Sequence, residues 1–303
     1  MAQKIITIIG PTALGKSSIG VLVARQIGGE IISADSRQVF RELTIGSGKI
    51  TPWEMGGIPH HMLDVVNLNA HYSVNTYVEQ ARAKIAEITT RGNTPIIVGG
   101  SGLYVDATIQ DMQFPDAEPN HNLREELSKK SLEELFTQLT ELDPDRAQTI
   151  DSKNPHRLIR AIEIATALGS VPEQTHKNAA YLYDAHQFGL TASPAFLRIQ
   201  IEKRLDDRLQ NGLIDEVKNI LKNGVAADYL ESFGLEYRYV TQYVRGALPY
   251  DDMRKQLTTK ICQYAKRQMT WFKRNPNITW FDREKLSVEE IATQIVEKFR
   301  TAA

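Results

Sequence analysis

The sequence predicts an α/β fold, in which helices flank a parallel sheet and an all-helical subdomain interrupts the chain. Two observations predict the sheet: a glycine-rich loop lies between an apolar strand and a helix, and strands alternate with helices over about the first hundred residues. The third observation is a linker at residues 114–119, Phe-Pro-Asp-Ala-Glu-Pro, after which the pattern becomes helical. We therefore expect a core made of residues 1–115 and 186–303, and an inserted helical subdomain of residues 116–185.

The glycine-rich loop is the most specific motif of the chain. Residues 10–17 read Gly-Pro-Thr-Ala-Leu-Gly-Lys-Ser, a complete Gly-x-x-x-x-Gly-Lys-Ser phosphate-binding loop (P-loop) between a strand over 5–9 and a helix over 17–27. This order directs backbone N–H groups and the positive end of the helix at one anion. Lys16 would reach the terminal phosphates, and the Ser17 hydroxyl would ligate Mg²⁺. The motif predicts a P-loop NTPase-like core that binds a di- or triphosphate through Gly10, Pro11, Thr12, Ala13, Leu14, Gly15, Lys16 and Ser17.

The other elements of the first half complete a βαβ pattern. A second strand is expected over 30–33, and a strand over 62–66 is followed by a helix over 73–91 and a strand over 94–98. This alternation implies parallel strands. Gly99-Gly100-Ser101-Gly102 follows the last of them, at the carboxyl end where open α/β sheets bind ligands.

The second half contains the insertion and the return to the sheet. Ser131-Leu-Glu-Glu134 has the pattern of a capping box, and Asn154-Pro155 starts a helix that runs to about Leu168. The remaining expected elements are a strand over 186–191, helices over 193–223 and 251–273, a strand over 277–281 and a capped helix from Ser287.

Composition limits the class of protein. The 303 residues are 42% hydrophobic and 24% charged, as in a soluble globular enzyme. The net charge of −1 excludes no nucleic-acid partner, because local patches bind phosphate backbones. The single cysteine, Cys262, excludes an intramolecular disulfide and a cysteine-rich zinc site. With no apolar run near ~20 residues and no secretory pattern at the N-terminus, we expect a cytoplasmic protein without a membrane span.

Asp35 follows the second strand and is the first candidate for chemistry. Its carboxylate would lie across the sheet edge from the P-loop, where it could hold Mg²⁺ or accept a proton from a nucleophile. A helix N-cap is an equally good explanation of the same spacing. Lys49 could contact phosphate or be a solvated surface charge. His60 and His61 are adjacent, so they face different ways and make a poor metal pair.

Taken in order, these motifs resemble the tRNA dimethylallyltransferases, also called tRNA isopentenyltransferases. The resemblance runs from Ile5 to about Phe281 and is closest to the bacterial type. It implies transfer of a dimethylallyl group from its diphosphate to N6 of adenosine 37, beside the anticodon of tRNA. The six matching motifs lie at residues 10–17, 35–38 (Asp-Ser-x-Gln), 57–61 (Gly-Ile-Pro-His-His), 98–104 (Val-Gly-Gly-Ser-Gly-Leu-Tyr), 151–163 and 263–272.

The resemblance also assigns roles at the donor site. The P-loop would hold the prenyl diphosphate as a leaving group, whose charge Lys16, Mg²⁺ on Ser17 and Arg204 would neutralise. Asp35 matches the general base, and Ser101 keeps the hydroxyl of the threonine usual in the family. An alternative for Arg204 is a surface ion pair with Asp206, Asp207 or Glu202. Gln200 and Arg208 depart from the family pattern and are left without a role.

On the acceptor side, residues 264–274 interleave basic and aromatic residues. Alone, such a stretch is typical of a solvated helix face, but the resemblance implies contact with a single-stranded tRNA loop whose base is flipped out. We expect a monomer that binds tRNA in this way. The predicted tRNA-binding residues are Asp35, Ser36, Arg37, Gln38, Ser101, Arg124, His156, Arg157, Arg160, Arg238, Lys266, Arg267, Gln268, Trp271 and Lys273.

Three other functions stay open. A small-molecule P-loop kinase would use the same loop for ATP, although residues 96–98 run into Gly99-Gly100 without the aspartate such enzymes place there. An adenylate isopentenyltransferase would share the donor, but AMP needs neither the inserted helices nor the basic stretch. A non-catalytic RNA-binding protein would leave Lys16, Ser17 and Asp35 without a use.

Overall fold

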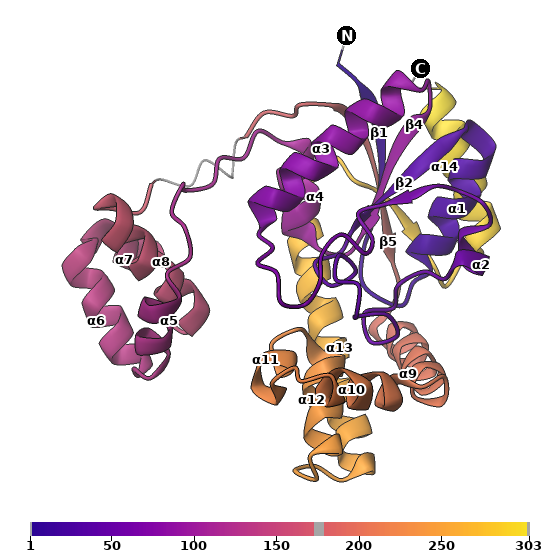
Figure 1. The fold of residues 1–303 in the computed structure, drawn as a ribbon. Helices are drawn as coiled ribbons and strands as arrows, with labels where there is room; N and C mark the ends of the chain where they lie inside the picture. The colour runs from indigo at the N-terminus through magenta and orange to yellow at the C-terminus, as the bar shows by residue number, and fades with distance from the viewer. Residues whose placement is uncertain (1, 173–178, 302–303) are drawn as a thin grey trace. The chain divides into compact units, whose positions relative to one another are not determined.

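The computed structural model describes residues 2–172 and 179–301 (Figure 1). The chain divides into two compact units, one made of residues 1–111 with 181–303 and the other of residues 112–180. The second unit interrupts the first, in the order that the sequence predicts. Its limits lie a few residues before the predicted 116 and 185, because Tyr181 and Leu182 already pair with the end of the first segment of the core.

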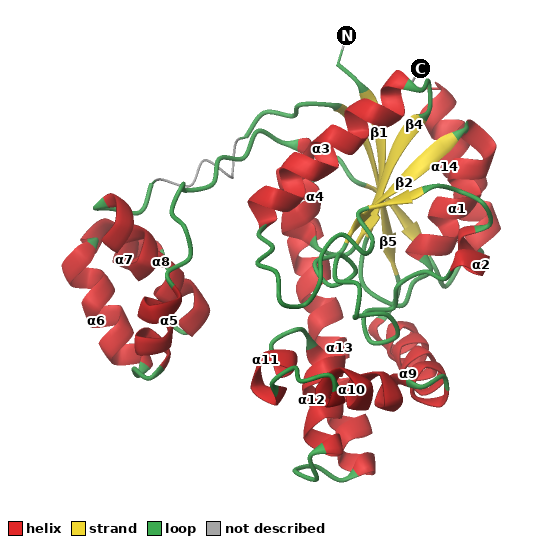
Figure 2. Ribbon diagram, in the orientation of Figure 1, coloured by secondary structure: helices red, strands yellow, loops and turns green. Residues whose placement is uncertain are grey.

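A six-stranded parallel sheet forms the centre of the core (Figure 2). The strand order is β3-β2-β4-β1-β5-β6. In the register of the sheet, Ile9 of β1 lies opposite Gly99 of β4, which in turn lies opposite Ala34 of β2. The segments that follow these three strands therefore begin at one edge of the sheet. The strands are β1 Lys4–Ile9, β2 Gly29–Ala34, β3 His60–His61, β4 Thr94–Gly99, β5 Asp184–Thr191 and β6 Thr279–Asp282.

Helices cover the sheet on both sides. The helices α1 (Lys16–Ile27) and α14 (Val288–Thr301) pack together on one side, and α3 (Val74–Thr90) and α4 (Gly102–Ile109) pack together on the other (Figure 1). The central strands are buried on both faces, which explains their continuous runs of isoleucine and valine. Helix α1 starts after Gly15 without a side-chain cap, which leaves its first N–H groups available to an anion.

Most of the predicted elements are confirmed, with two corrections. The strand expected over 62–66 is wrong: β3 ends at His61 because Met62 and Asp64 have φ of 63° and 55°, which extended strands do not allow. The helix expected over 193–223 is two helices, α9 (Pro194–Gln210) and α10 (Leu213–Lys222). They are separated at Gly212, whose φ of 98° interrupts the helical hydrogen bonds.

The described part of the core contains three further helices that were not predicted from the sequence. A short helix, α2 (Pro52–Met55), has a capping box formed by Thr51 and Glu54. Beyond α10 lie the other two, α11 (Ala227–Glu231) and α12 (Leu235–Val244). The long α13 (Tyr250–Phe272), predicted over 251–273, follows them and extends beyond the sheet in Figure 1. None of the helices in the described ranges is long and apolar enough to cross a membrane.

The described part of the inserted unit is all-helical, as predicted. The capping box of Ser131 and Glu134 makes both of its hydrogen bonds, and Asn154 caps the helix that begins at Pro155. The helices are α5 His121–Ser128, α6 Leu132–Leu142, α7 Pro144–Thr149 and α8 Pro155–Leu168. They enclose a core of their own, made of Leu127, Leu135, Leu139, Ala147, Leu158, Ala161 and Ile162.

Candidate active site

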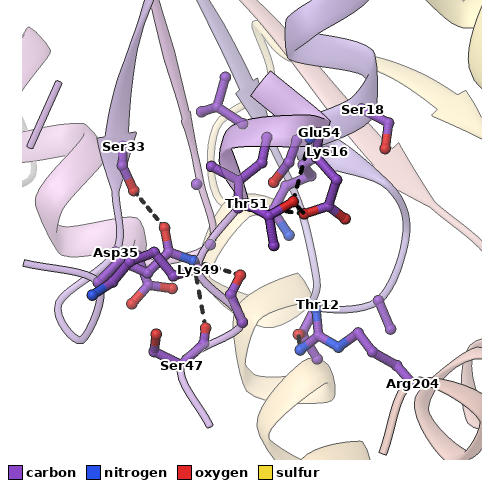
Figure 3. Close-up of a pocket in the computed structure, with 18 of the residues that line it drawn as sticks. Thr12, Lys16, Ser18, Ser33, Asp35, Ser47, Lys49, Thr51, Glu54 and Arg204 are labelled. Carbon is purple, nitrogen blue, oxygen red and sulfur yellow. Dashed lines mark hydrogen bonds between the residues drawn. The ribbon is translucent and has the colours of Figure 1, made fainter. Parts of the chain in front are cut away.

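A cavity of about 550 Å³ lies at the carboxyl ends of β1, β2 and β4. Its walls are the P-loop, the loop over residues 44–51, and side chains of α9 and α13 (Figure 3). This is the edge where open α/β sheets bind ligands. Nine predicted site residues line the cavity, namely Thr12, Ala13, Gly15, Lys16, Ser17, Asp35, Gln38, Arg204 and Gln268. The other three residues of the P-loop motif, Gly10, Pro11 and Leu14, are buried beneath it.

The P-loop has the compact form that its glycines allow. Gly10 has a φ of 136°, and a Cβ on it would lie 2.7 Å from the carbonyl oxygen of Leu190, so only glycine fits against β5. Lys16 is half-buried, and its Nζ donates to the carbonyl oxygen of Pro11 at 2.7 Å. Burial, and then the neighbouring Arg204, lower the pKa of Lys16 to about 7. An anion in the cavity would raise this pKa again, because it favours the charged ammonium.

Arg204 faces the same cavity from α9. Its guanidinium donates to Oγ1 of Thr12, and burial followed by the nearby Arg208 lowers its pKa to about 9 (Figure 3). Arg204 forms no ion pair with any described residue, so the alternative of a surface ion pair is wrong; Asp206 pairs instead with Arg254 at 2.6 Å. Lys16 and Arg204 thus present two positive charges to one cavity from two different elements.

Asp35 lies where β2 ends, and no helix follows it. Its Oδ1 accepts the backbone N–H of Arg37 at 2.8 Å, an Asx-turn, so the helix N-cap alternative is wrong. Ser101 begins the segment after β4, and its Oγ accepts the backbone N–H of Ser36 at 3.4 Å. The backbone N–H of Ser101 donates to the carbonyl oxygen of Ala34 at 3.3 Å. The predicted base and the predicted hydroxyl therefore belong to two segments that are bonded to each other.

Arg37 and Gln38 are engaged with the protein itself. The Arg37 guanidinium lies 5.7 Å from the centroid of the Phe233 ring. Gln38 accepts from the Ser33 hydroxyl at 2.9 Å and donates to the carbonyl oxygen of Gly48 at 3.1 Å. Gln38 thereby ties the loop over 44–51 to β2, and its contact with tRNA stays a prediction.

Glu216 on α10 organises that loop, although it was not among the residues predicted from the sequence. Its carboxylate accepts three consecutive backbone N–H groups, from Thr44 at 3.2 Å, Ile45 at 2.6 Å and Gly46 at 3.0 Å. The Tyr237 hydroxyl donates to the same carboxylate at 2.8 Å. Successive N–H groups in a glycine-containing turn form an anion site, which is the signal that could have suggested an internal carboxylate partner.

Arg208, which had no predicted role, contacts the same loop. Its Nη1 donates to Glu236 at 2.9 Å and to the carbonyl oxygen of Gly46 at 3.3 Å. A Cβ on Gly48 would lie 1.6 Å from Nη2 of Arg208, so the loop passes directly over the guanidinium. Arg208 supports the loop and is shielded from solvent with Glu236.

Lys49 and the two histidines make contacts within the core. Lys49 and His60 also line the cavity, and a contact of Lys49 with phosphate stays a prediction. Lys49 pairs with Asp64 at 2.5 Å and only 6% of its side chain is exposed, so the interpretation as a solvated surface charge is wrong. His60 contacts the carbonyl oxygen of Ile58 at 2.8 Å, whereas His61 contacts Glu30 at 2.6 Å. The two rings diverge, as predicted, and both residues lie in β3. Among the described residues, no group of three or more His, Cys, Asp or Glu side chains could hold a metal ion.

The predicted tRNA-binding residues of α13 and its C-cap, Lys273, fall into two groups. Gln268 is buried, and the Trp271 indole N–H donates to Asp106 of α4 at 2.7 Å. Lys266, Arg267 and Lys273 are exposed. The exposed group forms a basic surface, which we call the α13 cations.

The remaining predicted tRNA-binding residues lie elsewhere on the surface. On α12, Arg238 is exposed and donates to the carbonyl oxygen of Glu231 at 3.3 Å. In the inserted unit, His156 and Arg157 are exposed at the start of α8. Arg124 and Arg160 of that unit are half-exposed and both bind the buried Glu163, at 2.8 and 2.5 Å. They stabilise the fold of the unit, and their contact with tRNA stays a prediction.

Comparison with known proteins identifies the family. Residues 38–275 match the IPP transferase family. The tRNA dimethylallyltransferase of Carboxydothermus hydrogenoformans is 38% identical over 306 residues, which cover 98% of this chain and 97% of the relative. That of Geobacillus thermodenitrificans is 38% identical over 314 residues, which cover 100% of this chain and 99% of the relative.

Solved structures agree with the observed fold. The tRNA isopentenylpyrophosphate transferase of Bacillus halodurans is 34% identical, with a TM-score of 0.73, and the match covers 99% of this chain and 97% of that one. A eukaryotic dimethylallyltransferase acting on tRNA has a TM-score of 0.82 at 23% identity, over 99% of this chain and 80% of that one, and supports the fold alone. By sequence and by structure, the chain belongs to the IPP transferase family, which includes the tRNA dimethylallyltransferases.

Proposed function

We propose that this protein transfers the dimethylallyl group of dimethylallyl diphosphate to N6 of adenosine 37 in tRNA, forming N6-isopentenyladenosine and releasing diphosphate. One observation carries the proposal beyond family membership: Lys16 and Arg204 face the cavity that Asp35 also lines. Two cations suit a diphosphate leaving group, and a carboxylate suits an amine that must lose a proton.

On the donor side, the P-loop holds the diphosphate. As the bond between C1 of the prenyl group and the diphosphate oxygen breaks, the electron pair stays on that oxygen. Lys16, Arg204 and the N–H groups at the start of α1 stabilise the negative charge that develops there. A site of this kind lowers the barrier mainly through charges that are already in place before the reaction starts.

Ser17 is suited to a Mg²⁺ ion. Its side chain is exposed at the cavity, and the hydroxyl makes no hydrogen bond to another residue of the described ranges. Mg²⁺ prefers oxygen ligands and is commonly held by one or two protein groups together with substrate phosphates. Ser17 would hold the ion, and a bound Mg²⁺ would supply further positive charge for the leaving diphosphate.

On the acceptor side, Asp35 removes the proton. The exocyclic N6 of adenine attacks C1, the N6–C1 bond forms, and one N6 proton passes to the Asp35 carboxylate. Oδ1 is oriented by the Arg37 backbone N–H, whereas Oδ2 makes no hydrogen bond to any other described residue. The Ser101 hydroxyl lies on the adjoining segment and orients the reacting groups.

The tRNA is bound by positive charge and by stacking. The α13 cations, together with Arg37 and Arg238 and the basic residues of the inserted unit, contact the phosphates of the anticodon stem-loop. We propose that the enzyme acts in the cytoplasm as a monomer. The single cysteine is free, which suits a reducing compartment, and light scattering would report the oligomeric state.

The test is incubation of the protein with labelled dimethylallyl diphosphate, Mg²⁺ and an unmodified tRNA transcript, followed by nucleoside analysis. We expect the label in N6-isopentenyladenosine at position 37 and equimolar diphosphate. A transcript with guanosine at position 37 is the matched control and should stay unlabelled. Labelling of AMP but not tRNA would identify an adenylate isopentenyltransferase, and phosphate transfer from ATP to a nucleoside would identify a kinase.

A further inference from the structure

Gln268 makes two hydrogen bonds that join two separate loops. It lies within α13 and is only 7% exposed. Its Oε1 accepts the backbone N–H of Thr12 at 3.0 Å, and its Nε2 donates to the carbonyl oxygen of Gly100 at 2.9 Å. A Cβ on Gly100 would lie 2.3 Å from this Nε2, so glycine permits the close approach.

The first bond fixes the P-loop. Because the Thr12 N–H points to Gln268, this group does not serve the phosphate cradle. The Thr12 hydroxyl accepts from Arg204, so the residue is held from α13 and from α9 at once. Gln268 thus sets the position of the loop that carries the donor.

The second bond fixes the acceptor side. Gly100 directly precedes Ser101, whose Oγ accepts from the Ser36 backbone N–H and whose own N–H donates to Ala34. Asp35 lies between those two residues. A continuous series of hydrogen bonds therefore runs from the P-loop through Gln268 to the segment that carries the base.

We propose that Gln268 is a positioning residue that sets the geometry between the diphosphate and the attacking N6 amine. It acts through Thr12 and Gly100, and not by contact with tRNA. The inference rests on the proposed function, since it concerns the same transfer reaction. A carboxamide suits the role because it offers an acceptor and a donor at one planar end, whereas an ionised carboxylate offers acceptors only.

Loss of this geometry has a distinctive consequence. Transfer requires the amine at C1 as the C1–oxygen bond breaks, and small displacements of reacting groups lower rates strongly. If the amine is displaced while the diphosphate still leaves, water attacks C1 instead. The C1–oxygen bond to diphosphate breaks, a C1–oxygen bond to water forms, a proton is released, and the product is dimethylallyl alcohol.

The experiment compares Gln268→Leu and Gln268→Glu with Gln256→Leu and Gln256→Glu. Gln256 is an exposed glutamine on the same helix and is the matched control. For Gln268→Leu we expect kcat to fall about 10- to 100-fold, with KM for tRNA within about threefold of the parent. The ratio of dimethylallyl alcohol to modified tRNA should rise about tenfold or more. The control variants should match the parent in all three measurements.

The Gln268→Glu variant adds a test that depends on protonation. A carboxyl group buried at this position has a raised pKa, and its protonated form can donate to Gly100 and accept from Thr12. The rate of the variant divided by that of the parent should rise as the pH falls from about 8 to about 6. If Gln268→Leu does not fold, as judged by thermal unfolding, this variant carries the test.

Two results would overturn the proposal. The first is a raised KM for tRNA with parental kcat and parental alcohol ratio, which would make Gln268 a tRNA contact. The second is a rate ratio for Gln268→Glu that does not change with pH. Absence of transfer by the parent would instead defeat the proposed function, so the two failures are distinguishable.

Discussion

Lys16 and Arg204 carry positive charge into a space that is largely shielded from water. Burial is the main reason that the pKa values of both fall, and the second reason in each case is another cation, Arg204 beside Lys16 and Arg208 beside Arg204. A bound anion would therefore stabilise the charged form of each group, because it offsets the free-energy cost of keeping that charge away from water. Asp35 has the opposite effect, because its negative charge raises the pKa values of both Lys16 and Arg204.

Binding of inorganic diphosphate should depend on pH through Lys16. With a pKa of about 7 in the unliganded protein, Lys16 is protonated below that pH and loses its proton above it. Bound diphosphate raises this pKa, so above about pH 7 the protein takes up a proton when diphosphate binds. The affinity for diphosphate should therefore fall as the pH rises, with a slope that approaches about tenfold per pH unit. Calorimetric titration of the parent and of Lys16→Met from about pH 6 to 8.5 measures the difference. Equal pH dependence in both proteins would show that the ionisation of diphosphate alone is being observed.

Asp35→Asn should lower turnover while the fold is retained. Asparagine keeps an oxygen that accepts the Arg37 N–H, so the Asx-turn persists and only the proton-accepting charge is lost. We expect a loss of about 10²- to 10⁴-fold in the single-turnover rate at saturating tRNA and donor. Unchanged affinity for both substrates is the control. A rate within about threefold of the parent would remove Asp35 from the mechanism.

At the scale of elements, two features of the helices that follow the sheet shape the site. Helices α9, α10 and α12 hold the loop over residues 44–51 through Arg208, Glu216 and Tyr237, and this loop forms one wall of the cavity. Helix α13 carries the buried Gln268 at the site and the α13 cations on its exposed surface. The same helix thus serves the donor loop with one face and presents basic side chains with another.

Glu216→Gln should destabilise the protein by about 2 kcal/mol, because three backbone N–H groups lose a charged acceptor. Urea unfolding measures the change in the free energy of unfolding. Asp215→Asn, on the same helix but with 76% of its side chain exposed, is the matched control and should change it little. Equal midpoints for the two variants would mean that the loop does not depend on this carboxylate.

Neutralising the α13 cations should weaken tRNA binding and reduce its salt dependence. Each lost contact with a phosphate of a single strand lowers the slope of log K against log salt by about 0.7. The triple variant of Lys266, Arg267 and Lys273 to glutamine is compared with Lys255→Gln/Lys260→Gln, which alters exposed lysines earlier on the same helix. Fluorescence anisotropy over a range of KCl gives both slopes. An unchanged slope in the triple variant would show that these residues form an ordinary solvated helix face and do not contact phosphates of the tRNA.

At the scale of the whole molecule, the inserted unit leaves and re-enters the core at one place. The Leu182 N–H donates to the carbonyl oxygen of Ile109 at 2.9 Å, and Gln110 forms a β-bridge with Tyr181. The cavity is lined by residues of the core alone. The fold of the donor site therefore does not require the inserted unit.

Replacing residues 112–180 with a short Gly/Ser linker should leave the donor site intact, because Gln110 and Tyr181 already pair. We expect affinity for inorganic diphosphate within a few fold of the parent, and affinity for tRNA lowered about tenfold or more, which is about 1.4 kcal/mol. Titration with each ligand measures both. Unchanged tRNA binding would contradict a role of the unit in tRNA recognition, and lost diphosphate binding would contradict an independent core.

The sequence by itself determined the features that depend on neighbouring residues. The P-loop, the alternation that makes a parallel sheet, the capping box at Ser131 and the helix start at Pro155 all follow from local spacing, and the structure confirms them. Local spacing also suggested Asp35 and the P-loop, and Asp35 lines one cavity together with five of the eight P-loop residues.

Only the tertiary structure decided which distant groups meet. Gln268 is 256 residues from Thr12, and Glu216 is 170 residues from Gly46, so no local pattern reports either contact. The same holds for Lys49, whose ion pair joins it to Asp64, a residue 15 positions later with a left-handed backbone conformation. A side chain's partner depends on which segments the fold packs together, and hydrophobic burial and backbone geometry of the whole chain determine that packing.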